Sequence, residues 1–227
     1  GTRFFVRLGG GLRNKIVETG LENSRIFDLP ISIFTNAYYS SKNIYQYEYQ
    51  QGNKINRFNT IRLSEIEEER FGVKAFAGSV VGRNGLILAG IRQEYQRVNN
   101  LSNSDFGTYY SISALSFNAI FDNRSKTWFN SDGSLIKFNF ETTLLQETSV
   151  VGFTKAHFEY SGNLNTDFGV IKPSFQLGFA DATLPIPELF NLGGEDSFWG
   201  MREEEGRGRQ IVNASLAWQY QLPIHII

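Results

Sequence analysis

The sequence predicts an all-β protein whose strands form an antiparallel up-and-down transmembrane β-barrel. Three observations predict this fold: apolar and polar residues alternate along most of the chain, strand-like segments reach 11–15 residues, and aromatic residues gather near their ends. Strands of globular sheets usually have about 5–6 residues, whereas strands that cross a bilayer need about 9–11. The longest apolar run, 85–91, is far shorter than the roughly 20 residues of a membrane helix.

Composition agrees with a sheet and excludes several kinds of site. Aromatic residues make up 15% of the chain, and 22 glycines stand against 5 prolines, a mixture typical of strands and tight turns. The formal net charge of -1 argues against a nucleic-acid partner. The absence of cysteine excludes disulfides and thiolate chemistry, and His157 and His225 are the only histidines. We therefore expect no catalytic residue, no metal site and no cofactor in this chain.

The period-2 pattern predicts ten strands. Between 108 and 122 the apolar residues fall at odd positions, from Leu115 to Phe121, and Asn118 lies on the opposite face. The segment 211–222 alternates in the same way, with Leu216 and Trp218 on its apolar face. The predicted strands lie at about 3–13, 24–39, 44–51, 67–82, 86–98, 108–122, 133–146, 150–160, 167–181 and 209–222.

Predicted connections alternate between short and long, as they do in outer-membrane barrels. Short turns are expected at 40–43, 83–85 and 161–166, and long polar links at 14–24, 52–66, 98–107 and 183–208. The connection at 122–133 is long although it falls on the short-turn side. The chain starts and stops in strand-like sequence, so we expect residues 1–227 to be an internal portion of one larger barrel domain.

Two segments resemble one known family. The loop "NLGGEDSFWGMREEEGRGRQ" at 191–210 resembles the signature loop of the Omp85 superfamily (bacterial surface antigen D15 type), and "FDNRSKTWFNSDGS" resembles its conserved turn. The loop match rests on Leu192, Gly193, Gly194, Ser197, Phe198 and Gly200, followed by "GRGRQ". The turn match rests on Asp122, Arg124, Phe129 and Gly133.

The resemblance implies a sixteen-stranded barrel in the bacterial outer membrane, with about ten strands present and the loop at 183–208 folded back inside the lumen. It also implies a role in the insertion or translocation of proteins. The implied partners are outer-membrane lipid, client polypeptides and accessory envelope proteins.

The sequence departs from the family pattern inside the loop and in the strand that follows it. Trp199 stands where the family has an arginine, and Ala217 and Gln219 stand where the next strand often has Glu and Arg. In the family the loop arginine pairs with acids of the barrel wall. We therefore expect a substitute here, from Arg202, Arg207 or Arg209, paired with Glu141 or Glu159 on the lumen face.

Two alternatives remain open. The "FWGMREEE" segment is also similar to a branch in which the barrel is fused to a patatin-like phospholipase domain, whose nucleophile would lie upstream of Gly1 because this chain contains no G-x-S-x-G. Asp132 and Gly133 match the patatin "D-G" dipeptide, but they lie in the conserved turn, which favours a structural role. The second alternative is a soluble lipocalin-like or sandwich binding protein, which would show the same alternation.

Three other features have a structural interpretation and a functional one. His157 is expected to be a solvated wall residue rather than a ligand. The acidic run Glu65–Arg70 could hold a divalent cation through carboxylate oxygens, but a solvated loop and strand start is favoured. The charges at 202–209 are expected to pair with one another, because no apolar surroundings would shift a carboxyl pKa for acid–base chemistry.

Overall fold

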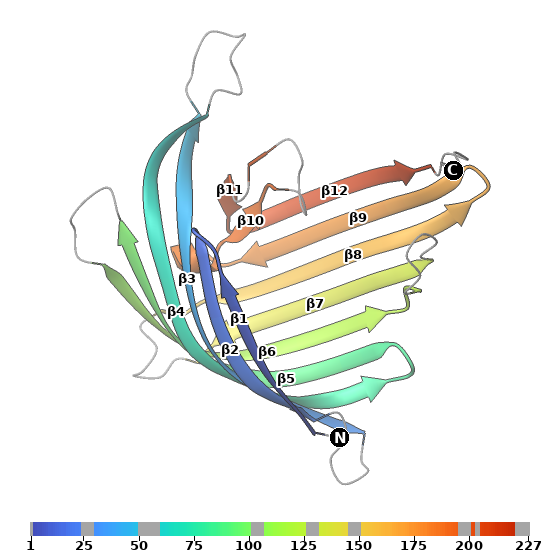
Figure 1. Ribbon diagram of the computed structural model, residues 1–227, viewed down its shortest axis with the longest axis horizontal. Helices are drawn as coiled ribbons and strands as arrows, with labels where there is room; N and C mark the ends of the chain where they lie inside the picture. Colours follow the sequence, from blue (N-terminus) through green and yellow to red (C-terminus); the bar gives the residue numbers. More distant parts are fainter. Residues whose placement is uncertain are drawn as a thin grey trace.

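Ten long strands pair with their neighbours in sequence order as one antiparallel, strongly curved sheet (Figure 1). The computed structural model describes residues 2–23, 30–49, 60–100, 107–125, 132–144, 151–194, 201–202 and 205–220. The predicted all-β antiparallel class is confirmed, and the main sheet has the predicted number of ten strands. These strands are β1 (Thr2–Gly10), β2 (Asn14–Asn23), β3 (Ile31–Tyr49), β4 (Thr60–Val81), β5 (Gly85–Asn100), β6 (Thr108–Asp122), β7 (Gly133–Thr143), β8 (Thr154–Thr166), β9 (Gly169–Ala180) and β12 (Gln210–Gln219).

The strand register gathers the apolar residues on the convex face of the sheet. Phe117 pairs with Phe140, and Phe138 pairs with Phe158 in the next strand. Since successive side chains of a strand point to opposite faces, these two pairings fix the faces of all three strands. Many large apolar side chains on this face are exposed, such as Leu216 at 75%. A protein that leaves so much apolar surface uncovered needs an apolar environment around it.

The concave face is polar, and much of it is buried. Glu68, Arg92, Glu94 and Gln96 are at most 6% exposed, although each would be costly to bury without partners. The apolar core on this side is small. It consists of Ile112, Ala114, Phe153 and Leu184, packed where the connection after β9 begins.

Two predicted boundaries near the N-terminus are wrong. The segment predicted as the link 14–24 is strand β2, whose pairing with β3 places Val17 opposite Tyr39. The predicted turn at 40–43 lies inside β3, where Ser41 pairs with Glu69 of β4. The prediction missed β2 and divided β3 into two strands. These two errors cancel, so the predicted number of strands is still ten. In both segments pairing with neighbouring strands overrides the local turn and charge preferences.

Strand β4 and the end of β8 also differ from the prediction. β4 begins at Thr60, inside the predicted link 52–66, so the acidic run Glu65–Arg70 is strand rather than loop. β8 continues through the predicted turn 161–166, and the chain reverses at 167–168 before β9. The predicted turn at 83–85 is close to the observed one at 82–84, where Gly82 adopts a φ of 63°, a conformation that favours glycine.

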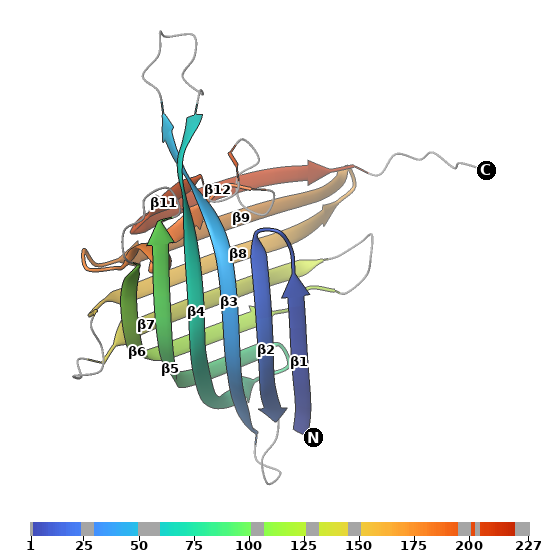
Figure 2. The ribbon, with the colours of Figure 1, turned by 60° about the vertical axis from the view of Figure 1, so that its left-hand side comes forward.

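Strands β3 and β4 rise beyond the other strands as a tall stem (Figure 2). They contain 19 and 22 residues, about twice what a bilayer crossing requires. Within the described ranges, no helix has the length and hydropathy needed to cross a membrane.

Candidate functional site

The long connection between β9 and β12 bends back toward the concave face of the sheet (Figure 1). It contains a short 3-10 helix, η1 (Ile186–Glu188), and two short strands, β10 (Phe190–Leu192) and β11 (Gly206–Gly208), which pair with each other. Pro185 and Pro187 flank the start of η1 and restrict φ there. This segment, residues 181–209, is called the inner loop below.

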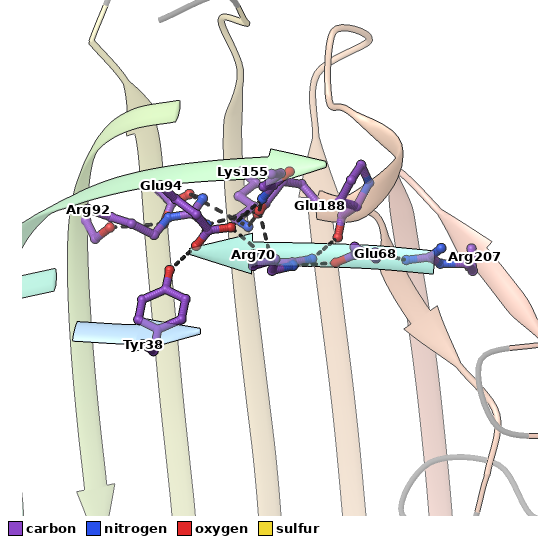
Figure 3. Close-up of polar contacts among 12 residues, drawn as sticks. Tyr38, Glu68, Arg70, Arg92, Glu94, Lys155, Glu188 and Arg207 are labelled. Atoms are coloured by element: carbon purple, nitrogen blue, oxygen red, sulfur yellow. Dashed lines mark hydrogen bonds and ion pairs between the residues drawn. The ribbon is translucent and has the colours of Figure 1, made fainter. Parts of the chain in front are cut away.

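Glu188 of the inner loop is bound by side chains from three strands of the sheet (Figure 3). Its Oε1 accepts hydrogen bonds from Arg92 Nη1 at 3.0 Å and from Arg70 Nη1 at 3.2 Å. The same oxygen accepts from Gln96 Nε2 at 2.6 Å, and Lys155 Nζ pairs with Oε2. The donors lie on β4, β5 and β8, and the Glu188 side chain is 1% exposed. Glu188 thus ties the loop to the sheet.

Other charges on the concave face complete a network around this contact. Arg92 also binds Glu94 at 3.1 Å and pairs with Glu141, and Tyr38 donates its hydroxyl hydrogen to Glu94. Arg70 pairs with Glu68. Arg92 and Glu94 are 5% and 1% exposed, so these charges have little water and depend on one another. We call this set of residues, with Glu188, Gln96 and Lys155, the latch cluster.

The charged state of Glu188 follows from its neighbours. Burial alone would raise the pKa of the Glu188 carboxyl, because desolvation disfavours the charged form. Arg92, Lys155 and Arg70 outweigh this effect and hold the pKa of Glu188 well below its usual range. Glu188 is therefore a carboxylate at neutral pH.

A second contact of the inner loop is aromatic. The Phe190 ring stacks on the His157 ring of β8, with 5.4 Å between the centroids. Next to it, a Cβ added to Gly178 of β9 would lie 3.0 Å from the Phe190 ring and 2.6 Å from Ile211. Gly178 thus leaves room for Phe190 where a side chain would collide.

Two cavities lie beside the latch cluster on the concave face. One, of about 510 Å³, is lined by residues of β2, β3 and β4, including Tyr38 and Arg70, and by Arg207 of the loop. The other, of about 470 Å³, is lined by Arg92, Lys155 and Glu188 together with polar residues of β6 and β7. Lys74 lines both cavities. The geometry suits a binding contact on the polar concave face of the sheet.

Comparison with known proteins gives the family. The family model described as "Omp85 superfamily domain" matches residues 1–225. The chain belongs to the Omp85 superfamily. It is accordingly an outer-membrane protein of bacteria, and its convex apolar face is the surface that meets lipid. The soluble lipocalin-like alternative is left without support.

A solved structure of this Omp85 barrel type has the same fold. The crystal structure of BamA from Haemophilus ducreyi lacking POTRA domains 1–3 matches with a TM-score of 0.78 and 16% sequence identity. The match covers 100% of this chain and 49% of that chain, so the present chain spans about half the length of the BamA structure. A search of curated protein sequences gave no match.

The predicted arginines of the Omp85 loop have different partners from those expected. Arg207 Nη2 lies 3.9 Å from Glu68 Oε2, and its Nε donates to Asn191 at 2.9 Å. Arg202 lies over the Tyr47 ring of β3 at 5.2 Å, and Arg209 is exposed.

The expected acidic partners are engaged elsewhere. Glu141 pairs with Arg92 and Lys155, and Glu159 pairs with Lys137 at 3.0 Å. A loop arginine does pair with an acid of the sheet, Arg207 with Glu68, but the acids named in the prediction, Glu141 and Glu159, pair with other residues. The most buried contact between loop and sheet has the opposite polarity: the loop supplies the acid, and the sheet supplies the cations.

The glycines of the loop signature form its turn. Leu192 ends β10, and Gly193 and Gly194 follow with φ of 122° and 89°, conformations that favour glycine. Gly194 N donates to Met201 O at 3.1 Å, which closes the turn across the loop. Ser197, Phe198, Trp199 and Gly200 lie outside the described residues. The similarity to the patatin-fused branch rests partly on them and stays a prediction.

The conserved-turn residues that the structure describes lie together. Asp122 binds Arg124 through both carboxylate oxygens, at 2.9 Å each. Gly133, with φ of 108°, begins β7 across the turn, and a Cβ there would collide with Asn123. Phe129 lies outside the described residues. Asp132 Oδ1 accepts from Gly133 N at 2.9 Å, a turn contact of the kind favoured for this residue.

The other candidate ligands have structural partners. His157 Nε2 is 3.0 Å from Gln176 Nε2, and its ring is covered by Phe190. In the acidic run, Glu69 lies 3.5 Å from Arg97, and Glu68 belongs to the latch cluster. Across the described ranges, no group of three or more His, Cys, Asp or Glu could hold a metal ion.

The central residues of the latch cluster were not found from the sequence. Glu188 lies in "LPIPELF", whose prolines indicate a stiff entry to the loop rather than a binding site. One signal was present: Arg92, Glu94 and Gln96 occupy alternate positions of one strand, so three polar groups point to one face. A lone acid directly after two prolines in an apolar loop segment was the complementary signal.

Proposed function

We propose that the chain is part of a closed sixteen-stranded outer-membrane barrel that takes part in the insertion or translocation of polypeptides. The Omp85 family match and the likeness to BamA support this function. In this proposal the concave face lines the lumen, the inner loop fills it, and residues 1–227 form a portion of one barrel domain. Client polypeptides and accessory envelope proteins are the proposed partners.

The observation that carries the proposal is the contact of Glu188 with Arg70, Arg92 and Lys155. It joins a loop to strands far from it in the sequence, through ion pairs rather than through a large apolar core. Ion pairs on a polar face can be exchanged for pairs with other charged groups when the loop moves. A loop held in this way suits a lumen that must be closed at rest and open during passage.

We propose that this chain itself catalyses no reaction. Among the described residues, His157 contacts Gln176 and Phe190 rather than a serine or threonine that it could activate. His225 lies outside the described residues. The chemical role of the sheet is then to bind and guide.

The proposal is tested with the full-length protein in proteoliposomes, to which an unfolded outer-membrane barrel protein is added. We expect folded, protease-resistant substrate to appear faster than in liposomes that contain an unrelated barrel. Glu188→Lys should slow this several-fold, since it places a cation among Arg70, Arg92 and Lys155. Glu18→Gln is the matched control. Glu18 of β2 lies on the concave face, as the latch cluster does, but it pairs with Arg7 and Asn36 instead. Wild-type protein no faster than the unrelated barrel would refute the proposal.

A further inference from the structure

The latch cluster holds a complete binding site for one carboxylate, and all of its donors belong to the sheet. Arg70 Nη1, Arg92 Nη1 and Gln96 Nε2 converge on Oε1 of Glu188, and Lys155 Nζ binds Oε2. Both carboxylate oxygens are used. The strands β4, β5 and β8 hold the backbones of these donors through their own ladders, so the donors stay on neighbouring parts of the sheet when the loop moves.

Removal of Glu188 would leave these donors with an excess of positive charge. Four cations of the sheet face the cluster: Lys74, Arg70, Arg92 and Lys155. They stand against three acids of the sheet: Glu68, Glu94 and Glu141. Arg92 is 5% exposed, and a buried cation that loses a partner is strongly destabilising. The site therefore favours another anion when the loop leaves.

The site is also reachable from the lumen side. The cavities of about 510 and 470 Å³ lie on either side of Arg70 and Lys74, and the larger does not include Glu188 in its lining. Lys74 lies over the Tyr38 ring, 4.5 Å from its centroid, and within the described part of the chain it forms no ion pair. Its ammonium group thus adds positive charge to both cavities. An acidic side chain entering either cavity would meet a cation first.

We infer that Arg70, Arg92, Gln96 and Lys155 form a carboxylate-binding site of the lumen wall, which Glu188 fills as a tethered occupant. Its second ligand is the acidic side chain of a polypeptide in the lumen, an Asp or Glu that takes the place of Glu188 when the inner loop withdraws. The origin of this ligand rests on the proposed function, whereas the site itself does not. Passage of an acidic segment and release of the loop are then coupled through one shared site.

Chemical rescue of Glu188→Ala in the full-length protein tests the site. The substitution removes the carboxylate and leaves space for a free one. We expect the midpoint of heat unfolding in detergent to fall by roughly 5–10 °C. Sodium acetate should restore most of this loss in a saturable way, whereas sodium chloride at the same ionic strength should not. A peptide of several glutamates should restore it at lower carboxylate concentration than acetate.

Two controls define the outcomes. Acetate should leave wild type and Glu188→Gln unchanged, because the site is filled in both. The double variant Glu188→Ala with Arg92→Gln should lose the acetate effect. The inference would be overturned if acetate and chloride had equal effects on Glu188→Ala. It would also be overturned if acetate raised the unfolding midpoint of the wild type as much as that of Glu188→Ala. This result would not bear on polypeptide insertion, which the liposome assay measures separately.

If Glu188→Ala does not fold in the membrane, a second measurement tests the site. The variant is then refolded from denaturant into detergent, with acetate or with chloride, and the folded fraction is read from its gel mobility before and after heating. A larger folded fraction with acetate supports the site. Equal folded fractions in the two salts contradict it.

Discussion

Arg92 is the residue on which most of the latch cluster depends. Its guanidinium binds Glu188, Glu94 and Glu141, acids from the inner loop, its own strand and β7. No other side chain of the cluster contacts these three acids together. Because the group is almost fully buried, its partners have little water to replace it.

Arg92→Ala should therefore lower the free energy of unfolding by about 3–5 kcal/mol, since it leaves three acids short of a buried partner. Heat unfolding of the full-length protein in detergent measures the change. Arg97→Ala is the matched control on the same strand. Its side chain is 47% exposed and 3.5 Å from Glu69, so its loss should cost under about 1 kcal/mol. Equal losses in the two variants would contradict a central role for Arg92.

The depressed pKa of Glu188 predicts how the loop contact depends on pH. A carboxyl whose pKa is lower in the folded state adds stability above its unfolded pKa, about 4.3 for Glu, and loses it as pH falls through the folded value. The difference in unfolding midpoint between wild type and Glu188→Gln should be constant near neutral pH and shrink in acid.

Measurement of both proteins over a pH series checks this expectation. Glu94 and Glu141 also face Arg92 and are present in both proteins, so their contribution is common to the two measurements. A difference that grew as the pH fell would mean that Glu188 is not held as a carboxylate.

At the scale of elements, the inner loop is positioned by charges and also by Gly178, whose lack of a side chain leaves room for Phe190. Phe190 of β10 lies over Gly178 of β9 and stacks on His157 of β8. Gly178→Val should displace Phe190 and loosen the loop, while β9 keeps its pairing with β8 and β12.

Labelling of an introduced cysteine measures this loosening, because the chain has no cysteine of its own. A thiol reagent should modify Leu192→Cys several-fold faster in the Gly178→Val background than in the wild-type background. Gly10→Val in β1 is the control, since a Cβ there would meet nothing within 4 Å. Unchanged labelling with Gly178→Val would show that the aromatic contact does not hold the loop.

The sequence predicted strands best where the two faces of a strand differ in polarity. From 108 onward the alternation predicted the strands and their apolar faces, because one face meets lipid and the other meets polar groups. It failed in β2, where Glu18, Gly20 and Glu22 suggested a polar link. It failed again at 40–43, where "SSKN" has turn chemistry but is paired on both sides by β2 and β4.

The candidate site was less predictable than the fold for a physical reason. Period 2 tells which face of a strand a side chain occupies, but not which distant strand or loop it meets. Arg70, Arg92 and Lys155 are far apart in sequence and are brought together by the register and curvature of the sheet. The family pattern pointed to loop arginines, and here a loop glutamate makes the most buried contact.

At the scale of the whole molecule, the two faces of the sheet should respond oppositely to charge. Phe117 and Asn118 are neighbours in β6 on the convex and concave faces. Phe117→Lys should cost about 2–4 kcal/mol because it places a cation in lipid, whereas Asn118→Lys, beside the 470 Å³ cavity, should cost far less. Heat unfolding of the two variants in lipid bilayers compares them directly. Equal costs would contradict the assignment of the convex face to the membrane.

The tall stem of β3 and β4 has a mechanical consequence. The ladder between these two strands runs without interruption, apart from one shift at Gln46/Tyr47, from the outer end of the stem down to Ser79. Tyr38 and Arg70 lie on this ladder, one on each strand. Beyond Lys42 of β3 and Ile66 of β4 the two strands pair only with each other, so the stem is a lever whose base lies close to Tyr38 and Arg70. A sideways load on the outer end is delivered to the groups that hold Glu188.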